Sequence, residues 1–448
     1  MSIFTPLKAS VKYSDLLLKL LFVLMALAWK LILEFYYELF SKDFGYYGMI
    51  YASRDGYNLS FSYTAVAVIA AFIPTQIRRP SWIVLVLLFL FCFVPVSVVF
   101  SCNERHPAMG FYGLSFCFLL LVLFQQINFL PAFNTPNYLK LDSLNGLLAV
   151  FYAGSFLAIA AYYGFALKWV SFADVYDTRA EYAGQSNRLI GYLYGWLSHV
   201  INIALMLYAW NRKNYALFAV AIAAQLYLYT LGGHKSVLLI IPFVFWVWAG
   251  VKFASRALSL YLLFTLFAIT TLLFYGDFQS GQYSNAASLF IRRNLLLPAQ
   301  IYFHFIEFFE NNYYDYFAQN FPFSLLYETK YNEKLPALIG KTYFTFKEGI
   351  YANGNVFADM FANMGYAAFV LGAVVLSLLL KLFDIVTKDK NLLFILPMAA
   401  VTIVTLSNSG LIVNLITHGI LIMVILLRWY PKTLFYLRFK NNKSTTHG

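Results

Sequence analysis

The segment from Ser81 to Phe100 reads SWIVLVLLFLFCFVPVSVVF and contains no charged residue. Coiled as an α-helix, a stretch of about 20 residues is about 30 Å long, the thickness of the hydrocarbon core of a bilayer. A strand of a transmembrane barrel would instead alternate between apolar and polar residues over about ten positions. The segment is continuously apolar and therefore predicts a transmembrane helix.

The composition of the whole chain extends this interpretation. Hydrophobic residues make up 61% of the 448 positions, aromatic residues 20% and charged residues 12%. A soluble domain has about a quarter charged residues, so lipid must be the main solvent for this chain. We expect an all-α polytopic membrane protein, with residues 1–448 forming a single integral membrane domain.

Apolar runs of similar length recur along the chain and predict about twelve transmembrane helices. The expected spans are Leu16–Phe40, Leu59–Ile77, Trp82–Phe100, Gly110–Phe129, Leu144–Ala166, Leu189–Trp210, Tyr215–Leu231, Val237–Val251, Leu258–Tyr275, Val356–Leu380, Asn391–Leu406 and Leu411–Leu427. The first run carries Lys30 and Glu34 one helical turn apart, is longer than a signal peptide and lacks a small-residue cleavage site. We expect it to stay in the membrane as an anchor.

Basic residues are unevenly divided between alternate loops, and this division predicts the orientation. One set of loops holds Lys8, Lys12, Lys19, Arg78, Arg79, Lys140, Arg212, Lys213, Lys252, Arg256, Lys381, Lys388, Lys390 and the basic tail Arg428–Lys443. Cytoplasmic loops retain positive charge during insertion, so both termini are expected in the cytoplasm of a bacterial inner membrane. The net charge of +12 then reflects topology and contact with anionic headgroups, and nucleic acid is not an expected partner.

Two outward loops are longer than helix connections require, and long loops are frequently functional. The first covers residues 168–188 and contains Arg179 and Arg188 among acidic and aromatic side chains. The second covers residues 276–355, between the ninth and tenth expected spans, and is long enough to form a periplasmic subdomain.

Arg292 and Arg293 lie next to each other in the second loop, on the side where positive charge is otherwise avoided. A guanidinium offers a planar fork of donors and stays charged, so a pair of them can hold a pyrophosphate. Arg179 and Arg188 supply further cations in the first loop. The alternative is that these arginines anchor the chain at headgroup phosphates.

Gln300, His304 and Glu307 lie after Pro298 and are separated from one another by four and three positions, which places them on one helical face. An imidazole titrates near neutral pH, so His304 is a candidate general base toward a sugar hydroxyl. The alternative is an ordinary histidine at the membrane interface.

Other outward residues are candidate substrate ligands. His234 and Lys235 in LGGHKS occupy a glycine-rich turn that a phosphate could approach, or that is a simple hairpin. Asp359 lies inside an apolar run, where a carboxylate is costly unless it lines a cavity. Tyr313 and Tyr314 could stack on sugar rings, and an interfacial aromatic belt is the alternative.

Polar residues inside the spans have less specific interpretations. Asn414 and His418, one turn apart in the last span, are expected to form interhelical hydrogen bonds. Cys92, Cys102 and Cys117 have neither metal-site spacing nor an even disulfide framework, and only Cys102 is expected to meet an oxidising compartment. No glycine-rich nucleotide loop or metal-binding motif is present, which favours a lipid-linked donor.

Four local stretches complete the pattern: VYDTRAEY around Arg179, GGHKS around Lys235, IRRN around Arg292, and FADMFANMGYAAF around Asp359. With about a dozen spans and two long outward loops, the chain resembles the Wzy-type polysaccharide repeat-unit polymerases, including O-antigen polymerases, which are similar to O-antigen ligases. It departs from that pattern in two places. Eleven residues separate Arg179 from Gly191 where some members have ten, and Lys235 stands where many relatives have arginine.

The resemblance implies metal-independent glycosyl transfer in lipopolysaccharide or related polysaccharide biosynthesis, without a cofactor. A glycan would pass from its polyisoprenyl (undecaprenyl) pyrophosphate to the sugar of another lipid-linked repeat unit. Arg292 and Arg293 would hold the pyrophosphate, Arg179 and Arg188 other phosphates, and His304 would be the base. Lipid-linked oligosaccharides, membrane lipids and a chain-length-regulating co-polymerase would be the partners.

Two alternatives remain open from the sequence. A ligase of the O-antigen type uses the same donor with a different acceptor. A flippase or transporter of lipid-linked oligosaccharides fits the number of spans, but should have short outer loops and polar residues that converge in the middle of the membrane.

The charge asymmetry predicts that Arg179, Lys235 and Arg293 face the periplasm, whereas Arg79 and Arg212 face the cytoplasm. Cysteines placed singly at these positions should react with a membrane-impermeant maleimide in intact spheroplasts only at the first three sites. Modification at position 79 without modification at position 293 would show that the orientation is inverted.

Overall fold

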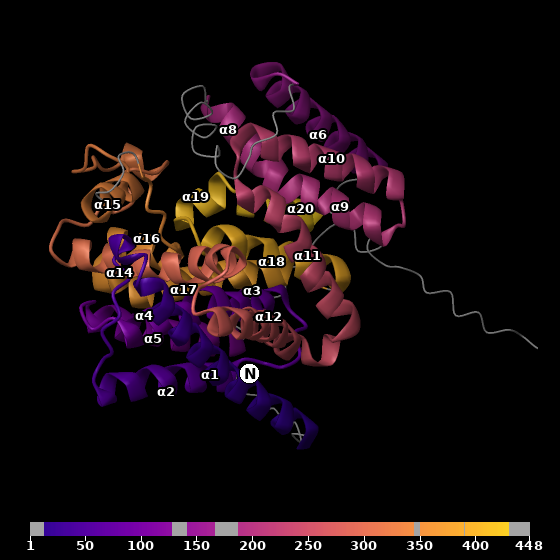
Figure 1. Ribbon diagram of the computed structural model, residues 1–448. Helices are drawn as coiled ribbons and strands as arrows, with labels where there is room; N and C mark the ends of the chain where they lie inside the picture. The colour runs from indigo at the N-terminus through magenta and orange to yellow at the C-terminus, as the bar shows by residue number, and fades with distance from the viewer. Residues whose placement is uncertain (1–12, 128–140, 166–186, 345–349, 389, 430–448) are drawn as a thin grey trace, which may run out of the picture. The chain divides into compact units, whose positions relative to one another are not determined.

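The computed structural model describes residues 13–127, 141–165, 187–344, 350–388 and 390–429 (Figure 1). Within these ranges the chain is helical, and its only β-type pairing is an isolated bridge between Ala52 and Asn103. The predicted all-α class is therefore confirmed. By length and composition, nine helices in the described part of the chain can cross a membrane. Three more apolar helices, Gly56–Phe72, Leu148–Tyr163 and Leu392–Leu406, are shorter, so the count of twelve spans remains a prediction.

The chain divides into two compact units. Unit 1 comprises Met1–Leu130, Ala249–Lys381 and Thr402–Asn414, and unit 2 comprises Pro131–Trp248, Leu382–Val401 and Leu415–Gly448. The first helices of unit 1 are α1 (Tyr13–Ser41), the 3₁₀ turn η1 (Gly45–Tyr47), α2 (Gly56–Phe72), α3 (Pro80–Leu88), the π-helix η2 (Phe89–Phe93), α4 (Val94–Cys102) and α5 (Ala108–Gln126). Those of unit 2 are α6 (Leu141–Tyr163), α8 (Arg188–Trp196), the π-helix η3 (Leu197–Ile201), α9 (Asn202–Asn211) and α10 (Tyr215–Gly232).

The remaining elements follow in chain order, and several helices run from one unit into the other. They are α11 (Lys235–Phe253), η4 (Ser255–Ala257), α12 (Leu258–Ser280), α13 (Asn285–Ala287), the π-helix η5 (Ser288–Leu296), α14 (Leu297–Glu310), η6 (Phe323–Leu325), α15 (Leu335–Tyr343), α16 (Val356–Met364), η7 (Gly365–Ala367), α17 (Ala368–Val386), α18 (Leu392–Leu406), α19 (Leu411–Ile416) and α20 (Ile420–Trp429).

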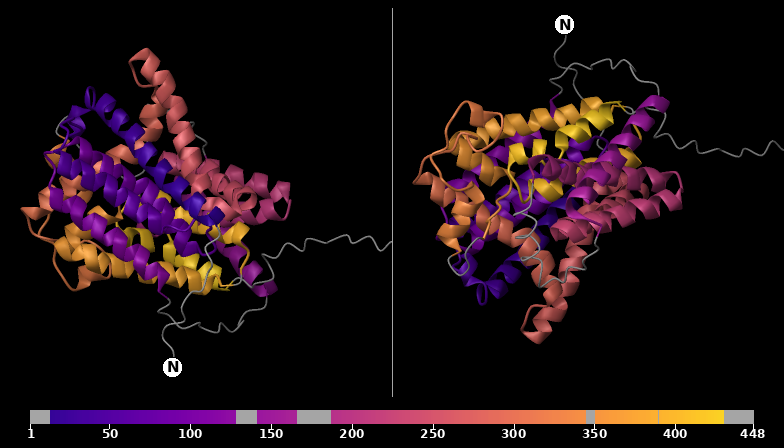
Figure 2. Two further views of the ribbon diagram at one scale, coloured as in Figure 1. Left: turned by 90° about the horizontal axis from the view of Figure 1, so that it is seen from below. Right: turned by 90° about the horizontal axis from the view of Figure 1, so that it is seen from above.

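The charge-free segment Ser81–Phe100 lies in the central helix of unit 1. This helix runs without a break through α3, η2 and α4, from Pro80 to Cys102. The most apolar window of this helix is 94% buried, as expected for a helix without a polar face. Its last part, α4, packs against α1, α2, α5 and α14, and the indigo and purple helices of this group lie side by side in all views (Figures 1 and 2).

Prolines account for two of the π-helical segments. Pro95 and Pro298 lie two residues after the ends of η2 and η5, respectively. A proline has no N–H to donate, and its ring clashes with the carbonyl four residues earlier, so the preceding turn widens. The widened turn in η5 carries both Arg292 and Arg293.

The stretch predicted as the second long loop is helical over much of its length. Residues 285–310 form one continuous helical run through α13, η5 and α14, and this run packs against α1, α4 and α16. Residues 311–343 then form a turn-rich region with η6 and α15, in which Asp315 accepts hydrogen bonds from Gln319 and Thr329. The periplasmic location of these residues remains a prediction.

An ion pair on α1 ties the central helix to its neighbours. Lys30 is fully buried, pairs with Glu34 one turn later and donates to Ser101 Oγ at 2.8 Å. Tyr63 donates its hydroxyl to Glu34, and Ser62 Oγ lies 2.8 Å from Ser101 Oγ. The predicted one-turn spacing of Lys30 and Glu34 therefore produces a buried pair that joins α1, α2 and α4.

The three cysteines are free and buried. The prediction that Cys102 would be accessible to an oxidising compartment is wrong, because only 4% of its surface is exposed where it ends α4.

Removal of one partner from the pair of Lys30 and Glu34 should lower the free energy of unfolding more than neutralising both residues does. Lys30→Met leaves Glu34 without its cation and should lower the free energy of unfolding by about 3 kcal/mol. Lys30→Met/Glu34→Gln keeps an acceptor for Tyr63 and should recover part of that loss. Thermal unfolding in detergent measures both variants, and a double variant less stable than the single one would contradict the pairing.

Candidate functional site

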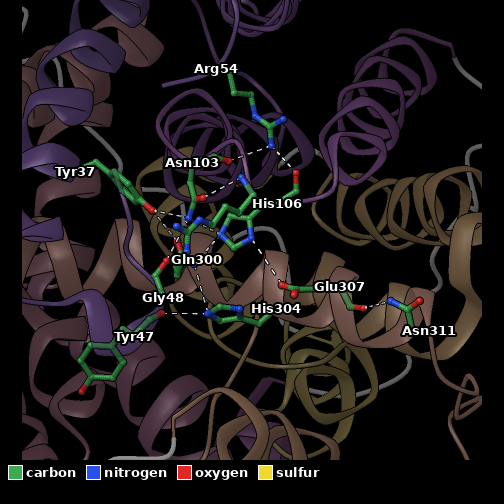
Figure 3. Close-up of polar contacts among 11 residues, drawn as sticks. Tyr37, Tyr47, Gly48, Arg54, Asn103, His106, Gln300, His304, Glu307 and Asn311 are labelled. Atoms are coloured by element: carbon green, nitrogen blue, oxygen red, sulfur yellow. Dashed lines mark hydrogen bonds and ion pairs between the residues drawn. The ribbon is translucent and has the colours of Figure 1, made fainter. Parts of the chain in front are cut away.

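A cluster of buried polar side chains in unit 1 lies where α14 meets the segment after α4 and the η1 turn (Figure 3). Gln300 and His304 come from one face of α14, as their spacing predicts. Asn103 and His106 follow the end of α4, and Gly48 follows η1. Each of the four side chains is at most 6% exposed, so their polar atoms must find partners within the protein.

Gln300 occupies the centre of the cluster. Its Nε2 donates to the carbonyl oxygen of Gly48 at 2.9 Å and lies 2.7 Å from Nε2 of His106. Its Oε1 accepts a hydrogen bond from the hydroxyl of Tyr37 at 3.0 Å. These bonds use both amide hydrogens and fix the orientation of the side chain.

Gly48 cannot be replaced in this arrangement without movement of the cluster. Its φ angle is +79°, and a Cβ atom at this position would lie 2.7 Å from Cε1 of His304. Both the left-handed backbone and the close approach of the imidazole therefore require glycine.

The contacts of His106 define its tautomer. Its Nε2 lies 2.7 Å from Gln300 Nε2 and 3.2 Å from Asn103 Nδ2, and amide nitrogens only donate. The proton therefore resides on Nδ1, which lies 4.0 Å from Oε2 of Glu307. Burial, followed by the proximity of His304, lowers the pKa of His106 to about 3, so its ring is neutral at neutral pH.

His304 has the opposite tautomer. Its Nε2 lies 3.1 Å from the carbonyl oxygen of Tyr47, which only accepts, so the proton is on Nε2. Its Nδ1 then carries a lone pair and has no hydrogen-bond partner among the described residues. Burial lowers the pKa of His304 to about 4, and its ring stacks on Tyr343 with centroids 4.3 Å apart. A neutral imidazole with a bare nitrogen can accept a proton from a substrate hydroxyl.

Arg292 also lies near Tyr47. Its guanidinium carbon is 3.9 Å from the ring centre of Phe44 and 5.9 Å from that of Tyr47, and its Nε donates to Ser288 Oγ at 3.0 Å. Burial lowers the pKa of Arg292, and no ion pair joins it to a carboxylate of the described residues. A partly desolvated guanidinium without a carboxylate partner is suited to bind an anion. Tyr47 thus contacts both Arg292, through its ring, and His304, through its carbonyl. Arg293 is partly buried beside them.

Arg54, which precedes α2, connects the end of α4 to the cluster. Its guanidinium donates to the carbonyl oxygens of Phe100, Asn103 and His106 and lies 4.1 Å above the ring of Phe100. The carbonyl of Phe100 belongs to the last turn of α4, which lacks helical N–H partners, and a cation there also complements the helix dipole. Arg54 therefore positions both Asn103 and His106.

Arg54, Asn103 and His106 were not predicted from the sequence. They lie in short connections between spans, whereas the sequence directed attention to the long loops. The available signal was the polar run SCNERHP, residues 101–107, which directly follows a charge-free span.

The other predicted residues lie outside this cluster. Arg179 is outside the described residues. Arg188 is exposed at the start of α8, and His234 and Lys235 are partly buried where α10 meets α11, all in unit 2. Tyr313 is exposed beneath the ammonium of Lys330, and Tyr314 packs beside Phe361.

Asp359 is held by its own unit. Its Oδ2 accepts the backbone N–H of Leu411 at 2.9 Å, and Oδ1 lies 3.4 Å from Nδ2 of Asn363. Asn355 caps α16 by accepting from Phe357 and Ala358. These bonds satisfy Asp359 without a ligand.

Comparison with known proteins identifies no relative: no family model, no curated protein and no solved structure matches the chain. Among the described residues, no group of three or more His, Cys, Asp or Glu side chains could hold a metal ion. The assignment of function therefore rests on the geometry of the cluster.

The two buried histidines predict a stability that falls in acid. The unfolded chain binds protons at both histidines below about pH 6.5, whereas the folded chain does not until about pH 4 and below. The free energy of unfolding should therefore decrease from about pH 6.5 to pH 4 by up to about 1.4 kcal/mol per pH unit for each histidine.

His106→Gln/His304→Gln is the matched comparison, because glutamine places an amide near the position of Nε2 but does not titrate in this range. Denaturation midpoints between pH 7 and pH 4 should fall less steeply for this variant than for the wild type. Equal slopes would show that the histidines are not kept neutral by the fold.

Proposed function

We propose that this chain is a multi-pass membrane glycosyltransferase that polymerises polyisoprenyl-pyrophosphate-linked oligosaccharide repeat units on the periplasmic face of a bacterial inner membrane. One observation carries the proposal: among the described residues, a partly desolvated guanidinium without a carboxylate partner contacts the ring of Tyr47, and a neutral imidazole with a bare nitrogen contacts the carbonyl of the same residue. The proposal includes the resemblance to O-antigen polymerases, the twelve spans and the cytoplasmic termini.

The proposed reaction uses these two groups for opposite charges. The acceptor hydroxyl oxygen attacks the anomeric carbon of the donor glycan as the bond from that carbon to the pyrophosphate oxygen breaks. The hydroxyl proton passes to Nδ1 of His304, and the negative charge that develops on the pyrophosphate is stabilised by Arg292 and Arg293. Partial burial strengthens this stabilisation because the effective dielectric around Arg292 is lower than in water.

The rest of the cluster supports the proton transfer. Once His304 is protonated, its Nε2–H remains bonded to the carbonyl of Tyr47. His106 stays neutral, so the new imidazolium does not face a second cation. Gln300 and Arg54 hold His106 in place, which makes both of them positioning residues.

A ligase would use the same residues with a different acceptor. The transporter alternative gains support from polar side chains buried inside candidate spans. Besides Lys30 in unit 1, unit 2 contains Asn202, whose Nδ2 donates to Gln225 Oε1 at 2.7 Å, and both residues are fully buried. Translocation of a lipid-linked oligosaccharide is therefore a second candidate function.

The arginine pair provides the direct test. Arg292→Lys or Arg293→Lys should reduce turnover more than it reduces membrane insertion, because an ammonium cannot replace a bidentate fork. Arg292→Ala/Arg293→Ala should lower the rate by roughly two or more orders of magnitude, and cells should then carry single-unit glycans at normal protein levels. Glycan length is measured on gels from cells with matched expression.

Arg78→Lys/Arg79→Lys is the matched control, since it changes an adjacent, exposed arginine pair without altering charge. It should leave glycan length unchanged. Long polymers from a stably inserted double-alanine variant would show that Arg292 and Arg293 are not needed for the reaction and only anchor the chain at lipid headgroups.

Purified protein in liposomes distinguishes the second candidate. The polymerase should lengthen lipid-linked glycans without any ion gradient. Translocation of the lipid without a change in glycan length would favour a transporter.

A further inference from the structure

The last candidate span, Leu411–Arg428, is interrupted near its middle. α19 ends at Ile416 and α20 begins at Ile420, so three residues, Thr417 to Gly419, leave the helix within an apolar stretch. A break inside a membrane span frees backbone groups that water cannot reach, and such breaks occur where protein or a ligand satisfies those groups.

The interruption is held in place by contacts within unit 2. Trp196 Nε1 donates to the carbonyl oxygen of Ile416 at 2.7 Å, which satisfies one of the freed groups. Gly419 has a φ angle of +80°, and a Cβ atom there would lie 3.0 Å from Cδ1 of Trp196. The break therefore depends on a glycine and on a specific tryptophan rather than on fraying of the helix end.

His418 lies at the centre of the interruption. Its Nδ1 is buried and has no hydrogen-bond partner among the described residues. The ring of His199 lies 5.0 Å away at an interplanar angle of 62°. His199 Nδ1 lies 3.1 Å from the carbonyl oxygen of Gly195 and 2.9 Å from Oγ of Ser198, so this nitrogen already has partners within unit 2. The sequence predicts an interhelical hydrogen bond for His418. Because Nδ1 makes no such bond in the described residues, we expect a partner from outside the chain.

The surroundings of the break favour a negatively charged partner. Gly419 precedes α20 and offers no side-chain acceptor to the first N–H groups of that helix, whose N-terminal end is positive. His199 and His234 act electrostatically on His418, and no carboxylate of the described residues does so. An imidazole that takes up a proton gains a second N–H donor toward an anion.

We propose that the interrupted helix of unit 2 binds a phosphate group, with His418 Nδ1 and the first N–H groups of α20 as donors. The group is either the headgroup of a polyprenyl phosphate or a free phosphate ion, since both present the same oxygens. Binding requires no transfer reaction at Arg292 and His304, so this inference stands apart from the proposed enzyme activity.

Trp196 provides a local probe of the site. Protein labelled with 5-fluorotryptophan gives a ¹⁹F resonance for each of its eight tryptophans, and Trp196→Phe assigns the relevant one. A short-chain polyprenyl phosphate, inorganic phosphate and the uncharged polyprenol are titrated separately in detergent. Trp248, which donates to Asn211 at 3.1 Å elsewhere in unit 2, is the internal control.

The Trp196 resonance should shift saturably with at least one phosphate compound, whereas the polyprenol and the Trp248 resonance should show no saturable change. A response to inorganic phosphate identifies a small-anion site, and a response to the lipid alone identifies a headgroup site. His418→Phe should weaken binding at least tenfold. His418→Asn, which keeps an amide near the position of Nδ1, should retain part of the affinity.

Three results would overturn the proposal. The first is the absence of a saturable Trp196 shift with both phosphates, and the second is an equal shift with the polyprenol. The third is unchanged affinity in His418→Asn and His418→Phe, each folded as judged by an unaltered Trp248 resonance. Loss of this binding with normal polymerisation would leave the function proposed for unit 1 intact, so the two proposals fail separately.

Discussion

The end of the central helix is the point on which the rest of unit 1 depends. A helix without a polar face, Pro80–Cys102, can be buried on all sides, but its last carbonyl groups still need donors. The guanidinium of Arg54 supplies them at Phe100 and Asn103, and the backbone N–H groups of Arg54 and Ala52 supply them at Ser101 and Cys102. The cation of Arg54 therefore also complements the negative end of the helix dipole. The next residues along the chain, Asn103 and His106, begin the candidate site, so the same interactions that complete the helix also place the first two polar side chains of the cluster.

Burial then decides the charge of each group in the cluster. The imidazoles of His106 and His304 lose less by staying neutral than by keeping a proton out of water, and their tautomers follow from the carbonyl and amide groups that they meet. A buried guanidinium cannot become neutral by losing its proton, because it stays protonated at any relevant pH. Arg292 instead lies over Phe44, where the face of the ring partly replaces water. A neutral base and a persistent cation that contact the same tyrosine are thus a consequence of burial acting on two kinds of side chain.

The sequence predicted what local spacing and composition determine. Continuous apolar runs predicted helices, the separation of Lys30 and Glu34 by four residues placed them one helical turn apart, and the spacing of Gln300 and His304 predicted a shared face. The contact between Gln300 and His106 joins residues 194 positions apart, and no local pattern contains it. Likewise, the bond from Trp196 to Ile416 spans 220 positions. The loops that looked most functional by length were the wrong guide to Arg54 and His106, because short connections that cap a buried helix carry fewer residues but tighter contacts.

Both candidate sites combine irregular helical backbone with an imidazole nitrogen that the described protein leaves unsatisfied. In unit 1, the π-helix η5 widens before Pro298 and presents Arg292, and Nδ1 of His304 lies bare beyond Tyr47. In unit 2, the π-helix η3 carries His199 and the break at Gly419 presents His418. A regular helix in hydrocarbon satisfies its own backbone, so each irregularity has a cost that packing alone does not repay. Glycines with positive φ angles, Gly48 and Gly419, stand beside both unsatisfied imidazoles and let the backbone approach closely. Open donors or acceptors beside irregular helical backbone are what a binding site requires, and the π-helix η2, which lies within the buried central helix, shows that a proline alone can also widen a turn.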